Sequence, residues 1–209
     1  FGRPLAFIMA DLDLLRTINN THGHLAGDAV LAGVGKIIRE SVREYDIAGR
    51  FGGEEFAIVL PETSMVGARA VAERIRRAVE SATFTAPTSS EQIHVTISMG
   101  IACFPEDART AKELLHEADL AMYQVKLKGR NGIMYAKDVP HFAKLDRAAL
   151  EGYSQNKYTE IFGEAIGQEP APGQPAPDSG QSRARPETLP IFRQYPKTWM
   201  TILIAGVVL

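Results

Sequence analysis

The stretch Arg50-Phe51-Gly52-Gly53-Glu54-Glu55-Phe56 places two glycines and two carboxylates between apolar runs. The apolar residues on either side have strand character and are Ile47, Phe51, Phe56, Ile58 and Leu60. Two adjacent glycines supply the positive φ angles of a tight two-residue turn, so the sequence predicts a hairpin that turns at Gly52-Gly53. Two acids at its tip repel each other unless a cation lies nearby.

A second acidic pair, Asp11 and Asp13, closes the apolar run from Pro4 to Ala10. The run has the length and composition of a buried strand. Acids at the end of a strand are typical of a Mg²⁺ site, so this pair is the second candidate for metal chemistry.

The spacing of apolar residues predicts an alternation of strands and helices up to Tyr135. The predicted helices are Asp28–Val42, Ser64–Ser81 and Ala111–Lys128. The predicted strands after the first are Asp46–Arg50, Glu55–Leu60, His94–Ala102 and Ile133–Tyr135. This order indicates an α/β fold of the α+β type, a ferredoxin-like antiparallel sheet flanked by helices on one face.

The composition changes after residue 138. Residues 139–166 are predicted to form a C-terminal helical extension, and residues 167–198 a disordered linker, because seven of the twelve prolines fall between Pro170 and Pro196. Residues 199–209 are apolar and uncharged, but a membrane helix needs about 20 residues. A buried strand or a bare hydrophobic end remains an alternative. The arginines before Trp199 favour the start of a transmembrane helix entered from the cytoplasmic side.

The chain has 209 residues, is 45% hydrophobic and carries a formal net charge of -2. This charge gives no reason to expect a nucleic acid partner. Its single cysteine, Cys103, excludes an intrachain disulfide and is expected to be a small buried strand residue.

Six motifs in order resemble the GGDEF family of diguanylate cyclases. They are Asp11-x-Asp13, Asn19, Gly23-His24, Gly27-Asp28, Arg50 to Phe56 in a GGEEF variant, and Lys126-x-x-Gly129-Arg130-Asn131. The resemblance covers Pro4 to Tyr135 and implies the cyclase-type palm, here as a domain over residues 1–138. The family's usual opening segment is missing, so the sequence is expected to begin inside its domain.

The resemblance implies a metal site and the catalytic acids. Asp11, Glu54 and the backbone carbonyl of Leu12 would ligate Mg²⁺ or Mn²⁺, and Glu54 and Glu55 are the predicted catalytic residues. Without the hairpin, Asp11 could equally be a helix N-cap or a turn acid.

The resemblance also implies how GTP is held. Asn19 and Asp28 would recognise guanine, although Asp28 alone could be the N-cap of the following helix and Asn19 a turn residue. Backbone amides from Leu14 through Leu15 to Arg16 would cradle the β- and γ-phosphates. Lys126 and Arg130 would grip the triphosphate; the alternative is a solvated basic helix end.

A further implied site is regulatory. Arg43 and Asp46 match the family's Arg-x-x-Asp motif, at which the product binds and inhibits, and Arg74 falls where a second arginine assists. The alternative is a surface ion pair at i, i+3.

The predicted function is condensation of two GTP into cyclic di-GMP and pyrophosphate by a homodimer, in the cytoplasmic domain of a bacterial inner-membrane protein with a membrane tether. Leu15, Arg16 and Asn20 depart from the family's usual residues. They support one alternative, a catalytically silent domain that senses GTP or cyclic di-GMP. A further alternative is a structural module that tethers a membrane sensor.

Overall fold

The computed structural model describes residues 3–87 and 90–140. The predicted linker and membrane segment, and nearly all of the predicted helical extension, lie outside these residues. Among the helices that are described, none is long and apolar enough to cross a bilayer.

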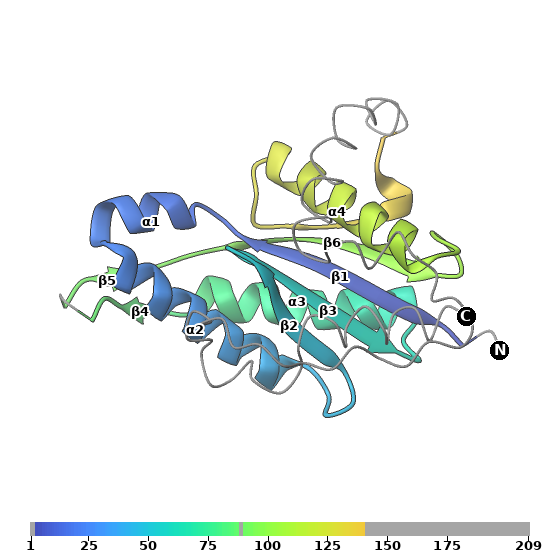
Figure 1. Cartoon of the computed structure of the whole chain (residues 1–209), viewed down its shortest axis with the longest axis horizontal. Coiled ribbons are helices and arrows are strands. Elements are labelled where there is room, and N and C mark those ends of the chain that lie inside the picture. The colour runs from blue at the N-terminus through green and yellow to red at the C-terminus, as the bar shows by residue number, and fades with distance from the viewer. Residues whose placement is uncertain (1–2, 88–89, 141–209) are drawn as a thin grey trace, which may run out of the picture.

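A five-stranded sheet in the order β2-β3-β1-β6-β7 forms the centre of the domain (Figure 1). Its strands are β1 (Leu5–Leu12), β2 (Ile47–Gly52), β3 (Glu55–Pro61), β6 (Ile97–Phe104) and β7 (Ile133–Tyr135). Every residue of β1 is buried, as the apolar run after Pro4 predicts for a central strand. Cys103 lies on β6 with 2% of its surface exposed, as expected.

Helices cover both faces of the sheet, and the prediction of helices on one face is wrong. The helices are α1 (Leu15–His22), α2 (His24–Ser41), α3 (Met65–Ser81) and α4 (Ala111–Leu127). Ala6, Ile8 and Ala10 of β1 pack in one core with α2 and α3. Leu5, Phe7 and Met9 pack in a second core with α4, which lies on the opposite side of the sheet in Figure 1. The alternation of side chains along β1 therefore supplies two apolar faces, each of which needs a helical cover.

The sheet is mixed rather than purely antiparallel. β1 pairs antiparallel with β3 and with β6, but β7 pairs parallel with β6. The parallel pairing follows from α4, which crosses over the sheet between β6 and β7. A separate two-stranded sheet, β4 (Phe84–Thr85) and β5 (Gln92–Ile93), and a 3₁₀ turn at Ala136–Asp138 were not predicted.

The hairpin forms as predicted, but its turn is one residue further along the chain. Gly52 still pairs with Glu55, so Gly53 and Glu54 make the turn, after a register shift between Arg50 and Gly52. In the described part of the chain the glycines with positive φ are Gly23 and Gly129, so the expected positive φ at the hairpin glycines is wrong. The guanidinium of Arg50 donates from Nε to the Gly53 carbonyl at 2.8 Å and braces this turn instead.

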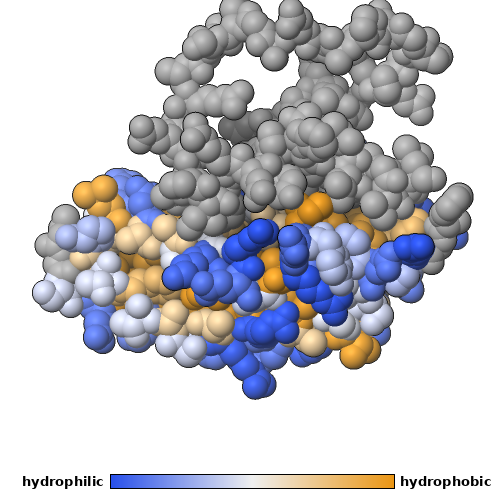
Figure 2. Space-filling view, turned by 90° about the horizontal axis from the view of Figure 1, so that it is seen from below, coloured by the Kyte–Doolittle hydropathy of each residue, from blue (hydrophilic) through white to orange (hydrophobic). Residues whose placement is uncertain are grey.

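The outer face on which α2 lies mixes charged and apolar residues (Figure 2). An amphipathic helix is the usual result when one side of the helix packs on a sheet and the other faces solvent.

Candidate active site at the end of the central strands

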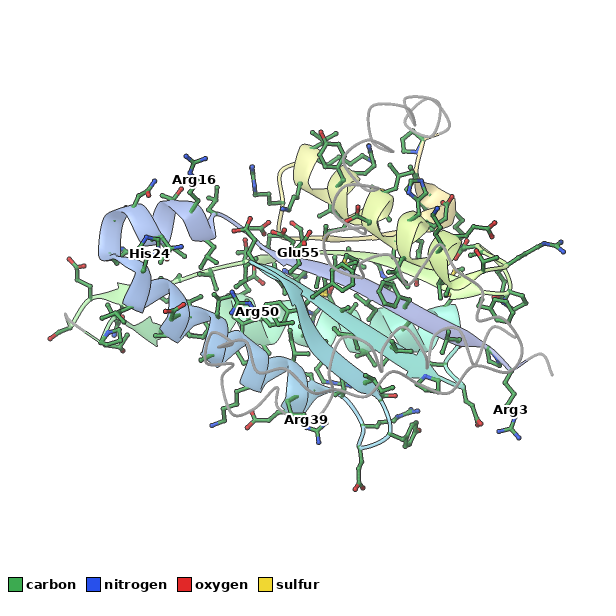
Figure 3. All side chains as sticks on the ribbon, in the orientation of Figure 1. Arg3, Arg16, His24, Arg39, Arg50 and Glu55 are labelled. Carbon is green, nitrogen blue, oxygen red and sulfur yellow. The ribbon has the colours of Figure 1, made fainter. Side chains whose placement is uncertain are left out.

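The sheet register brings the two predicted acidic clusters together. Asp11, near the end of β1, pairs with Glu55 at the start of β3, and the Leu12 amide donates to the Glu54 carbonyl at 3.1 Å. Opposite residues of an antiparallel pair share a face, so the carboxylates of Asp11 and Glu55 belong to the same side of the sheet. Figure 3 shows Glu55 at this end of the sheet, next to α1, with Arg3 at the far end.

Asp11 is a buried carboxylate with one cationic partner. It is 3% exposed, and its Oδ1 lies 2.7 Å from Nζ of Lys126 in the last turn of α4. The pKa of Asp11 is raised from 3.8 to about 7, chiefly because the carboxyl is buried; the contact with Lys126 opposes this rise, and the charges of Glu54 and Glu55 add to it. Asp11 thus interacts with two further acids and with one lysine, and an added cation would relieve the repulsion among the acids.

The chemistry of these donors fits a hard divalent ion held partly by its substrate. Asp11 and Glu54 offer carboxylate oxygens, and Leu12 offers a backbone carbonyl between them in the chain. Over residues 3–87 and 90–140, no group of three or more His, Cys, Asp or Glu side chains forms a metal cluster. A metal here would take its remaining ligands from phosphate and water, as Mg²⁺ commonly does.

Asp13 differs from Asp11 in its surroundings. Its Oδ1 accepts from the Ser98 hydroxyl at 2.7 Å, and its Oδ2 accepts from the Thr96 hydroxyl at 2.7 Å and from the Asn131 amide at 3.1 Å. Protein donors therefore occupy both oxygens, and Asp13 is a structural anchor. The sequence alone does not distinguish Asp11 from Asp13, because both follow the same apolar run.

The turn from β1 into α1 presents backbone amides beside Asp11. Leu14 has a left-handed backbone, with φ of 61°, and its carbonyl accepts from the Thr17 and Ile18 amides. The first amides of a helix have no acceptor within the helix, which leaves those from Leu14 to Arg16 able to bind an anion. Leu15 is buried, and Arg16 points away from the sheet in Figure 3.

Asn19 lies against α2 with an unpaired acceptor. Its Oδ1 is buried and has no hydrogen-bond partner, and a Cβ atom added at Gly27 would lie 1.9 Å from it. Asp28 follows Gly27 and is exposed. Because α2 begins at His24, Asp28 lies one turn inside the helix, and the N-cap alternative is wrong; Asn19 lies within α1, so the turn alternative is wrong too.

Lys126 and Arg130 lie on either side of the end of α4. Lys126 contacts Asp11, whereas Arg130 is exposed in the turn that follows, where Gly129, Arg130 and Asn131 all have positive φ. The amide of Arg130 donates to the Val125 carbonyl at 3.0 Å. The lysine therefore contacts the acidic cluster, whereas the arginine is exposed to solvent in the turn after α4.

The predicted regulatory residues surround the end of α2. Asp46 is buried, and its Oδ2 accepts from the main-chain amide of Arg43 at 2.8 Å while its Oδ1 has no partner. Arg43 instead donates from its side chain to the Tyr45 hydroxyl at 2.7 Å, so the expected alternative of an Arg43–Asp46 surface ion pair is wrong. Arg74 on α3 donates from Nε to the Ser41 carbonyl at 3.1 Å.

Comparison with known proteins agrees with this architecture. A family model described as diguanylate cyclase, GGDEF domain, matches residues 2–132. The sequence is 43% identical over 134 residues to diguanylate cyclase A of Treponema denticola, a match that covers 64% of this chain and 36% of that protein. The matched region spans 36% of the length of that protein and as little as 19% of the length of other curated relatives.

Solved structures share the fold. The GGDEF domain of TpbB from Pseudomonas aeruginosa has a TM-score of 0.62 at 36% identity, with 64% of this chain and 77% of that chain covered. The GGDEF domain of DgcB from Caulobacter crescentus, solved in complex with c-di-GMP, has a TM-score of 0.62 at 29% identity, with 66% and 80% covered.

Proposed function

The chain belongs to the GGDEF-domain family of diguanylate cyclases, and on this premise we propose that its domain condenses two GTP molecules into cyclic di-GMP and two pyrophosphates. The observation that carries the proposal is the buried Asp11 carboxylate, which lies opposite Glu55 and holds Lys126. Asp13, in contrast, has both oxygens occupied by hydroxyl and amide donors.

In the proposed reaction each 3′-hydroxyl attacks the α-phosphorus of the other GTP, a new P–O bond forms, and the bond to pyrophosphate breaks. The proton of the 3′-hydroxyl passes to a carboxylate, for which Glu54 and Glu55 are the proposed acceptors. A bound Mg²⁺ or Mn²⁺ would neutralise phosphate charge, held by Asp11, the Leu12 carbonyl and Glu54.

The remaining residues bind and orient the nucleotide. We assign guanine recognition to Asn19, whose buried Oδ1 lacks a donor and suits a guanine N–H, and to exposed Asp28. The amides from Leu14 to Arg16, with Lys126 and Arg130, are proposed to hold the triphosphate. Orientation matters because phosphoryl transfer needs attacking and leaving oxygens in line.

Since each domain is proposed to hold one GTP, the reaction requires a homodimer. Turnover per protein should therefore rise with protein concentration until dimers saturate. A rate per protein that stays constant down to a verified monomer would refute the dimer requirement.

Glu54→Gln is the direct test of catalysis. It keeps the volume of the turn residue but removes a proposed base and ligand, and we expect cyclic di-GMP formation from GTP to fall below detection. Glu62→Gln, an acid just beyond the far end of β3, is the matched control and should retain activity. A Glu54→Gln enzyme with wild-type turnover would overturn the assignment.

We further propose that cyclic di-GMP binds at Arg43, Asp46 and Arg74 and inhibits the enzyme. The buried, unpaired Oδ1 of Asp46 can accept a guanine N–H, and the two guanidinium groups suit phosphates. Arg43→Ala should weaken cyclic di-GMP binding by about 10-fold or more, as expected for charge-assisted hydrogen bonds, while initial rates are retained. Equal affinity of both proteins by calorimetry would reject the site.

A further inference from the structure

Asn131 joins three segments of the fold immediately after Arg130. Its main-chain amide donates to Asp13 Oδ2 at 3.1 Å. Its side-chain oxygen accepts from Arg76 Nη1 at 2.9 Å, and its side-chain nitrogen donates to Glu80 Oε1 at 2.7 Å. Arg76 can only donate and the Glu80 carboxylate can only accept, so together they fix the orientation of the Asn131 side-chain amide.

The Asp13 side of this junction is anchored to the sheet. Thr96 immediately precedes β6, and Ser98 is the second residue of that strand. Both hydroxyls donate to the Asp13 carboxylate, which also accepts from the Asn131 amide. Asp13 lies two residues after Asp11, so the anchor and the proposed metal ligand belong to one short stretch of backbone. The position of Asn131 is therefore defined relative to Asp11.

The α3 side is equally well defined. The Arg76 side chain is 16% exposed and is held by Glu73 at 3.0 Å and by Glu80 at 3.0 Å, one turn to either side on the same helix. An arginine held in this way keeps a fixed direction for its remaining N–H groups. Asn131 thus receives its hydrogen bond from a pre-organised donor.

We propose that Asn131 and Arg76 are positioning residues that fix Arg130 for the triphosphate, an inference that rests on the proposed function. Arg130 and Asn131 both have left-handed backbones, with φ of 68° and 46°. Consecutive non-glycine residues keep this conformation only where their surroundings impose it, and the contacts of Asn131 do so here. Loosening Asn131 should release Arg130 and leave guanine recognition, on α1 and α2, unchanged.

The test compares two adjacent arginines of α3. Arg76→Ala removes the contact with Asn131, while Arg77→Ala removes an equal charge that bonds Glu73 and does not contact Asn131. With Arg76→Ala we expect KM for GTP and the dissociation constant for inorganic triphosphate with Mg²⁺ to rise about tenfold, with kcat nearly unchanged, because uniform binding is lost. Arg77→Ala should match the wild type.

Asn131→Gly provides the second variant. It keeps the amide that bonds Asp13 and tolerates the φ of 46°, but it lacks the side-chain contacts to α3, so it should reproduce Arg76→Ala without loss of folding. Calorimetry with GMP should give wild-type affinity in every variant. If the two variants bind triphosphate as the wild type does, or if Arg77→Ala weakens it equally, the positioning role is overturned.

The two proposals fail in different ways. A wild-type protein that binds triphosphate and makes no cyclic di-GMP would overturn the proposed activity, whereas the triphosphate titration would still decide the role of Asn131. Normal turnover with unchanged triphosphate affinity in Asn131→Gly would overturn only the positioning role.

Discussion

Gly100→Ala should disrupt the contact between β6 and α4. A Cβ atom at Gly100 would lie 2.0 Å from the Ala118 carbonyl oxygen and 2.3 Å from the Met122 amide nitrogen. Both obstacles are helix backbone, which cannot rotate away as a side chain could. The substitution therefore forces α4 as a whole to move off the sheet.

The size of the effect follows from the contact distance. To reach an ordinary contact of 3.4 Å with the Ala118 oxygen, α4 has to retreat by about 1.4 Å, and a gap of about 0.5–1 Å already loses roughly a quarter to a half of the dispersion energy across the interface. Overpacking of this kind typically costs 1–3 kcal/mol, so we expect the free energy of unfolding to fall by about 3 kcal/mol. The displacement also carries Lys126 away from Asp11, so activity should fall in the fraction that remains folded.

Urea unfolding followed by far-ultraviolet circular dichroism measures this loss. A decrease of about 3 kcal/mol lowers the unfolding midpoint by about 1–3 M for ordinary slopes. Gly49→Ala is the matched control, a strand glycine on β2 whose added Cβ meets nothing within 4 Å, and it should change stability by less than about 0.5 kcal/mol. Equal midpoints for the two variants would refute the packing argument.

Three further outcomes are expected. Gly27→Ala should weaken GMP binding but change stability little, because the atom that a Cβ would meet at 1.9 Å belongs to the rotatable Asn19 side chain; unchanged GMP affinity in a calorimetric titration would contradict this. In EDTA, stability should decrease as the pH rises from 3.8 to about 7, because folded Asp11 keeps a proton that the unfolded chain loses; urea midpoints of Asp11→Asn should lack this decrease. Glu73 has the opposite effect at lower pH, because hydrogen bonds from Arg76 and Arg77 lower its pKa to about 2. Its contribution to the free energy of unfolding is lost as the pH falls from 4.5 toward 2. The Glu73→Gln variant should therefore lose less stability over this pH range, as followed by circular dichroism.

Periodicity in the sequence was enough to locate most of the core elements. Long apolar stripes predicted α3 and α4 within a residue or two, and the hairpin acids fell opposite Asp11 because a short turn fixes strand register. The site could be anticipated because its acids lie at the ends of elements that the apolar pattern defines.

Helix α1 was missed for an equally physical reason. It has eight residues, only two of which, Leu15 and Ile18, are buried, and no side chain caps its first turn. A helix of about two turns with so small an apolar face gives no periodic signal. Its position depends on tertiary contact with α2, which no local pattern records.

The two-sided sheet, by contrast, did leave a signal in the sequence. Residues Leu5 to Ala10 are apolar without alternation, which indicates a strand buried on both faces and therefore helices on both. A strand with one solvent face would have alternated. The order of the elements alone does not record what covers the second face of the sheet.

Successive side chains of β1 point to opposite faces of the sheet, and this explains why the acids of the candidate site lie on the α4 side. Phe7 and Met9 point into the core under α4, and Asp11 and Asp13 continue that face as the strand leaves the apolar interior. A slip of one residue between β1 and its neighbours would turn the acids to the α2 and α3 side and exchange the β1 residues that pack in the two cores, so the cores that fix the register also fix the face of the acids. Once there, Asp11 meets Lys126 and Asp13 meets Asn131, one at each side of the Arg130 turn. The placement of Lys126 beside Asp11, the proposed metal ligand, thus follows from packing β1 against α4.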